Sequence, residues 1–143
     1  MIAPARRIKA LNLLERMKRH EMEDDLRALA DLNARIANGR AERDVLKDRL
    51  QSETQVTEPG AMPYVAGFMR AMRDEIAKVD AQLEDLGRQS DALDDVVRER
   101  FREAKTFASV ADRLRDQQRV AAQMREAKDN DEIALTRWQR RTG

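Results

Sequence analysis

The sequence predicts an all-α protein in which two long helices form an antiparallel coiled-coil hairpin, the second helix being longer and ending in a C-terminal overhang. Charged residues make up 38% of the 143-residue chain and aromatic residues only 3%, a composition typical of long helices and coiled coils. Apolar residues recur at steps of three and four along most of the chain. A single break interrupts this pattern at residues 52–64, where Pro59-Gly60 predicts a turn.

The first helix is expected over residues 8–53. From Met22 onward it carries a heptad seam, interrupted by Asp25, Gly39 and Arg43. Gly39 weakens the helix locally, and it indicates either a close approach of the second helix or a flexible point. The apolar members of the seam are Met22, Leu29, Leu32, Ile36, Leu46 and Leu50. Upstream, Ile8, Leu11, Leu14 and Met17 step by threes, which predicts a local change of register.

A loop is expected over residues 54–63, and the second helix over residues 64–141. Pro63 suits the first turn of that helix. Its seam is longer than the first and includes the polar residues Ser90, Arg100 and Gln118. The apolar members are Met72, Ile76, Val79, Leu83, Leu86, Leu93, Val97, Ala104, Phe107, Ala111, Leu114 and Ala121. The whole chain, residues 1–143, is expected to form one coiled-coil domain.

A pivot near Glu58 predicts which residues face each other. It brings Leu46 near Met72 and Ile36 near Ala81. In this register the second helix outruns the first, and everything beyond Val110 lacks a partner within the chain. That segment still carries apolar residues, namely Leu114, Val120, Met124, Ile133, Leu135 and Trp138. An exposed apolar stripe of this kind predicts an interaction with another chain.

Composition and charge argue against several classes of protein. The net charge of +1 gives no electrostatic reason to expect a nucleic-acid binder, and the single internal break favours a hairpin over a basic-region zipper. The chain has no cysteine, which excludes disulfides and thiolate metal sites and fits a reducing compartment. It has no apolar run near 18 residues and no secretory signal, so we expect a cytoplasmic protein without a transmembrane segment.

No catalytic, cofactor or metal site is predicted. The glycines are scattered, so neither a GxxxxGK[ST] phosphate loop nor a GxGxxG motif exists. The lone His20 has no cysteine or second histidine with which to form a metal site, and we expect it on a solvated helix surface. A serine triad would need that same histidine in a cleft, which two helices do not provide.

Two clusters of residues are the candidate partner-binding sites. The N-terminal basic cluster comprises Arg6, Arg7, Lys9, Arg16, Lys18 and Arg19, and the C-terminal cluster comprises Leu135, Arg137, Trp138, Arg140 and Arg141. Ordinary charge asymmetry is one interpretation of both clusters. Docking onto an acidic protein surface or onto lipid headgroups is the other.

Two stretches carry a resemblance to a known family. They are FREAKTFASVADRL, Phe101 to Leu114, and an acidic step before a basic tail, in which Asp129-Asn130-Asp131-Glu132 precedes Ile133 to Arg137. With the single break and the longer second helix, they resemble the FliJ family of the flagellar type III export apparatus. The second stretch is similar to that family's acidic C-terminal pattern before basic residues. The resemblance covers nearly the whole chain.

The resemblance implies a non-catalytic stalk, similar to part of the gamma subunit of rotary ATPases. Its implied partners are the hexameric flagellar export ATPase, the cytoplasmic domain of the export gate and export chaperones, at the cytoplasmic side of the inner membrane. Two alternatives stay open: a stalk of the YscO family in virulence secretion, and a homodimeric coiled-coil tether or adaptor. The stalk interpretation predicts a monomer in isolation and the tether predicts a dimer.

Overall fold

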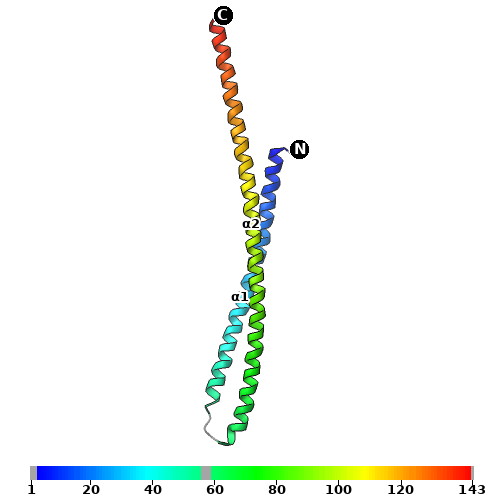
Figure 1. Cartoon of the computed structure of the whole chain (residues 1–143), viewed down its shortest axis with the longest axis vertical. Helices are drawn as coiled ribbons and strands as arrows, with labels where there is room; N and C mark the ends of the chain where they lie inside the picture. Colours follow the sequence, from blue (N-terminus) through cyan, green and yellow to red (C-terminus); the bar gives the residue numbers. More distant parts are fainter. Residues whose placement is uncertain (1–2, 56–58, 143) are drawn as a thin grey trace. The chain divides into compact units, whose positions relative to one another are not determined.

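The computed structural model describes residues 3–55 and 59–142, and within them the chain forms two long helices (Figure 1). Helix α1 spans Pro4–Glu53, the short 3-10 helix η1 spans Pro59–Ala61, and helix α2 spans Met62–Thr142. No strand occurs in these residues, and α2 is the longer helix, so the expected fold class is confirmed. Glu58, the expected pivot, lies outside the described residues.

Local hydrogen bonds explain where α1 begins and ends. Pro4 takes the first helical position, where its missing N–H costs nothing, and the backbone N–H groups of Arg6 and Arg7 donate to the Ala3 carbonyl at 3.0 and 3.1 Å. At the other end the Thr54 hydroxyl donates to the Leu50 carbonyl at 2.7 Å. This bond adds a side-chain donor to a carbonyl of the last helical turn.

The chain divides into two compact units, and each of them pairs a piece of α1 with an antiparallel piece of α2. The loop unit is Met22–Glu99 and contains the connection between the helices. The terminal unit contains the residues up to Glu21 and those from Arg100 onward, and therefore both candidate clusters.

The expected seams are confirmed by burial. Every expected seam position of α2 is buried or half-buried except Gln118, and the most covered are Val79, Ala104 and Ala111, the last only 1% exposed. Their small size lets the facing helix come close. In α1 the residues that seemed to interrupt the seam, Asp25 and Arg43, are half-buried as well. The residues that face α2 therefore follow an unbroken heptad from Met22 to Leu50, although some of them are not hydrophobic.

The expected register of the loop unit is wrong by about six residues. Ile36 lines a shallow groove together with Gly87 and Ser90, not with Ala81. Arg43 Nη1 contacts Asp80 Oδ1 at 3.5 Å, and the same offset displaces the expected pairing of Leu46 with Met72. The physical reason is the connection between the helices. Because η1 and the early start of α2 at Met62 shift the residues of α2 that face α1, the centre of the antiparallel pairing does not coincide with the centre of the break in the sequence pattern.

Gly39 marks a close approach of the two helices. A Cβ atom at this position would lie 2.7 Å from Leu83 Cδ2 and 3.4 Å from Leu83 Cγ. Such a contact is too short for two carbon atoms, so the missing side chain makes room for Leu83. Of the two explanations for this glycine, close helix approach is the one that the structure supports.

The expected register change near the start of α1 is absent. Glu15 and Lys18 continue the heptad from Ile8 and Leu11 and are half-buried, whereas Leu14 and Met17 are exposed. Polar residues occupy these seam positions because their aliphatic stems can cover the facing helix while their charged ends pair with other charges. The hydrophobic pattern alone therefore selected the wrong face of α1.

The segment of α2 without a partner begins later than expected. Ala111 is buried, and Leu114 and Ala121 are half-buried, so residues just beyond Val110 still pack within the chain. Pro4 and Arg7 of α1 share a groove with Ala121, because α1 begins earlier than expected and the register is shifted. From residue 122 to residue 142 every residue is exposed. This stretch of 21 residues is called the overhang below.

Candidate partner-binding surfaces

The terminal unit divides the N-terminal basic cluster into paired and solvent-facing cations. Lys18 Nζ lies 2.8 Å from Glu103 Oε2 and 3.6 Å from Glu21 Oε2, and Arg19 Nε lies 3.0 Å from Glu15 Oε1. These two cations therefore bind within the chain. The other members, Arg6, Arg7, Lys9 and Arg16, are exposed and make no ion pair with the residues that the structure describes.

Lys18 belongs to a charged network that bridges the two helices. Arg100 Nη1 contacts Glu21 Oε2 at 2.7 Å, so Glu21 binds one cation from each helix. The hydrogen bond to Glu103 is the main cause that raises the pKa of Lys18 above its ordinary value of 10.5, and the charges of Glu103 and Glu21 add to it, while desolvation acts in the opposite direction. The side chains are about one third exposed, so the network contributes to register more than to stability.

An apolar strip accompanies the solvent-facing cations of α1. Leu13 is 57% exposed and Met17 is 49% exposed, and Leu14 is exposed beside them. Sequence reasoning missed this strip, because it assigned Leu14 and Met17 to the seam. The signal that could have found it is the unbroken heptad of the half-buried positions, which passes through Glu15 and Lys18 instead.

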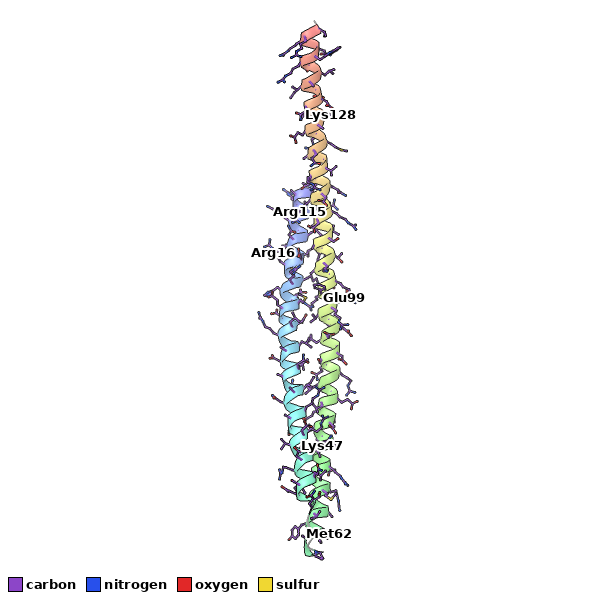
Figure 2. All side chains as sticks on the ribbon, turned by 90° about the vertical axis from the view of Figure 1, so that its left-hand side faces the viewer. Arg16, Lys47, Met62, Glu99, Arg115 and Lys128 are labelled. Carbon is purple, nitrogen blue, oxygen red and sulfur yellow. The ribbon has the colours of Figure 1, made fainter. Side chains whose placement is uncertain are left out.

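The whole C-terminal cluster lies on the overhang and is exposed. Trp138 is 62% exposed and lines a shallow groove with Ala134, Arg137 and Arg141. Arg140 lines a neighbouring groove with Asp129 and Glu132, and Leu135 is also exposed. Figure 2 shows this part of α2, marked by Lys128, continuing past the start of α1. The structure thus brings the five residues of the cluster together on the last turns of one helix.

The overhang carries a second heptad stripe. The sequence predicts an exposed apolar stripe in this segment, including Val120, Met124 and Trp138, but not its heptad spacing or its alanine members. Its members follow each other at steps of four, three, seven and four, the spacing of a coiled-coil seam, and all of them are exposed. They are Val120, just before the overhang, and Met124, Ala127, Ala134 and Trp138 within it, with Asp131 at the heptad position that the step of seven passes over. Each member of this overhang stripe lies one residue before a position of the heptad that faces α1. The stripe is therefore rotated by about 100° around the axis of α2 relative to the α1-facing seam. It is therefore a separate seam and not a continuation of the first.

Charge along the overhang changes sign. Asp129, Asp131 and Glu132 precede Arg137, Arg140 and Arg141, and no ion pair joins the two groups in the part of the chain that the structure describes. A surface with an apolar stripe, a tryptophan and adjacent arginines has the composition found at the energetic centres of protein interfaces.

The described residues contain no group of histidine, cysteine or carboxylate side chains suited to hold a metal ion, and His20 is exposed. Among these same residues, no helix combines the length and the apolar character that crossing a bilayer requires.

Comparison with curated proteins and with solved structures finds no match. The family model described as flagellar FliJ protein matches residues 8–143, which is nearly the whole chain and includes both helices and both candidate clusters. This chain therefore belongs to the FliJ family and is a component of flagellar type III protein export.

Proposed function

We propose that this chain is the non-catalytic stalk of the export apparatus, which binds the hexameric export ATPase and the cytoplasmic domain of the export gate. The observation that carries the proposal is the overhang: 21 exposed residues whose apolar stripe has coiled-coil spacing and ends at Trp138. A helix with a vacant seam fits a groove or a helix of another protein. Membership of the family supplies the class of partner.

The stalk would act through differential contacts. A ligand shifts a conformational equilibrium only by the difference in its affinities for the two states, and an asymmetric helix inside a ring contacts the subunits unequally. The apolar stripe and the arginines of the overhang are unevenly distributed around α2. Some ring subunits would therefore contact apolar side chains and others would contact cations. This asymmetry would couple the ATPase cycle to export without a catalytic residue in the stalk. Export chaperones are further expected partners, with the chain in the cytoplasm, peripheral to the inner membrane at the flagellar base.

A pull-down with the export ATPase and, separately, with the gate's cytoplasmic domain tests the proposal. We expect Met124→Glu, which places a charge in the overhang stripe, to weaken capture of at least one of them by tenfold or more. The matched control is Ala122→Glu, which adds the same charge about 160° away on the same exposed helix. Equal loss with both variants would argue against the stripe, and absence of binding by the unmodified chain to either partner would refute the proposed function.

A homodimeric tether is the second candidate, because the same exposed stripe could pair with that of a second copy. The two candidates differ in the mass of the isolated chain. Light scattering at low micromolar concentration should give the mass of one chain for the stalk and of two chains for the tether.

A further inference from the structure

The first five turns of α1 present a face of unusual chemistry to solvent. At about 100° per residue, the half of α1 turned away from α2 carries a recurring set of small, apolar and basic residues, and all of them are exposed. They are Arg6, Lys9, Ala10, Leu13, Arg16 and Met17. We call this set the outer face, and Arg16 marks it in Figure 2.

The positive charge of the outer face is uncompensated. Glu15 is the only acidic residue between Ala3 and His20, and it lies on the seam, where its carboxylate binds Arg19. Arg6, Lys9 and Arg16 make no ion pair with any described residue. The face is therefore complementary to a negatively charged surface.

The apolar part of the outer face is too short for a partner helix. A coiled-coil seam must continue for several heptads, yet the positions one heptad before Leu13 and one heptad after Met17 are Arg6 and Asp24. Ala10, Leu13, Leu14 and Met17 thus form a strip of about two turns, bordered by cations. No aromatic side chain is present to act as an anchor in a protein pocket.

We infer that the outer face of α1 docks onto an anionic lipid surface. A helix that combines a strip of exposed Leu and Met with Lys and Arg lies in the plane of a membrane interface, with its apolar residues at the headgroup boundary and its cations among the phosphates. Clusters of cations on such a helix bind anionic lipids, and Arg6, Lys9 and Arg16 supply three of them on the outer face, whereas Arg7 lies toward α2 in the groove with Ala121. The inference does not rest on the proposed stalk role, since it concerns α1 and lipid alone.

The overhang provides a contrast within the same unit. It also carries exposed apolar residues and five cations, but four carboxylates are exposed among them, namely Glu126, Asp129, Asp131 and Glu132. An anionic bilayer would repel these carboxylates, so the overhang should stay in water while the outer face binds.

Co-sedimentation of the full chain with vesicles tests the inference. Vesicles of phosphatidylglycerol mixed with phosphatidylcholine should bind the chain, and vesicles of phosphatidylcholine alone should not. Each cation near an anionic surface strengthens binding roughly fivefold, so the variant Arg6→Gln/Lys9→Gln/Arg16→Gln should bind about 100-fold more weakly. Raising the salt concentration should weaken the unmodified chain, because screening acts within about 10 Å.

The matched control is Arg137→Gln/Arg140→Gln/Arg141→Gln, which removes the same number of charges from the overhang and should bind vesicles like the unmodified chain. Leu13→Ala/Met17→Ala, at two exposed positions, should weaken binding severalfold without loss of helical circular dichroism. Trp138 is the only tryptophan, and its fluorescence should not shift to shorter wavelength on vesicles. This readout needs no variant and reports whether the overhang enters the bilayer.

Equal binding to neutral and anionic vesicles, equal loss in both charge variants, or a shift of Trp138 fluorescence would overturn the inference. A second result would also overturn it: no binding of the chain to anionic vesicles, together with weaker capture by the gate's cytoplasmic domain when Arg6, Lys9 and Arg16 are replaced. The outer face would then bind an acidic protein surface. The vesicle assay contains no ATPase or gate, so its result is independent of the proposed function.

Discussion

Replacing Gly39 by alanine would have two opposing effects on stability, one from helix propensity and one from the contact with Leu83. In a helix interior, alanine is favoured over glycine by up to about 1 kcal/mol, but a Cβ at Gly39 would lie 2.7 Å from Leu83 Cδ2. We expect the two effects to offset each other in Gly39→Ala, leaving the free energy of unfolding within about 0.5 kcal/mol of the parent. Urea denaturation followed by circular dichroism measures it.

Gly87→Ala is the control for that prediction. Gly87 is also inside a helix and half-buried, yet nothing lies within 4 Å of its virtual Cβ. This variant should therefore be more stable than the parent by about 0.5–1 kcal/mol. Equal stabilisation by both substitutions would show that Gly39 is not a point of close helix contact.

Trp138 should matter for binding and not for folding. Because the side chain is 62% exposed on the overhang, Trp138→Ala should leave the melting temperature unchanged while weakening partner binding by about 1–3 kcal/mol. Titration against the export ATPase and against the gate domain, with thermal unfolding of the isolated chain, checks both halves. Tyr64→Ala removes another exposed aromatic ring, near the start of α2, and should affect neither quantity. Normal affinity with a large fall in melting temperature would mean that the indole packs inside the protein.

Lys18 links stability to pH. Its pKa is raised by the hydrogen bond to Glu103, so the folded state holds the proton more tightly than the unfolded state. The resulting stabilisation is complete below the ordinary value of 10.5 and is lost as pH rises through the higher folded pKa. Lys18→Gln should therefore melt below the parent at neutral pH and approach it at high pH. Lys47→Gln, at an exposed lysine of α1, is the control, and a pH-independent difference for Lys18→Gln would contradict the assignment.

At the scale of the helix, stability comes from a narrow seam. Val79 is 4% exposed, so Val79→Ala should lower the free energy of unfolding by about 2 kcal/mol, the cost of removing two buried methyl groups. Val45→Ala makes the same chemical change at an exposed position of α1 and should stay within about 0.5 kcal/mol of the parent. Denaturant midpoints that fall equally for both would show that the seam is not the core.

The seams could be predicted from sequence because helical burial is periodic. Met72 to Ala121 were identified at steps of three and four, and the polar residues Ser90 and Arg100 were correctly placed among them. Spacing alone decides which face of a helix is covered, provided that most of its seam residues are apolar. This condition holds for α2 up to Ala121.

The parts that could not be predicted depend on residues far apart in the chain. Lys18 was assigned to the wrong face because its seam position becomes favourable only beside Glu103, 85 residues away. The register depends on where α2 begins after the connection, which spacing within one helix does not determine. The heptad spacing of the overhang stripe was missed because alanines supply two of its five members and carry little hydrophobic signal.

At the scale of the whole molecule, the chain should act on catalysis without performing it. We expect no ATP hydrolysis by the purified chain, which has no phosphate loop, and a saturable rise in the turnover of the export ATPase as the chain is added. Met124→Glu should abolish the rise, and Ala122→Glu should preserve it. Hydrolysis by the chain alone, or partner turnover that stays constant throughout the titration, would contradict the respective half of this expectation.

The overhang also has a consequence for the energetics of complex formation. Most of the stability of a protein helix comes from packing of one of its faces, and the described residues 122–142 are all exposed and form no ion pair with one another. The amide protons of the overhang should exchange with deuterium far faster than those near Ala104 and Ala111. Binding would then include the conformational entropy of ordering these turns, which lowers affinity for a given contact area and allows rapid release. In the proposed stalk role, the overhang would then dissociate from each ring subunit in turn, while the paired helices keep their structure.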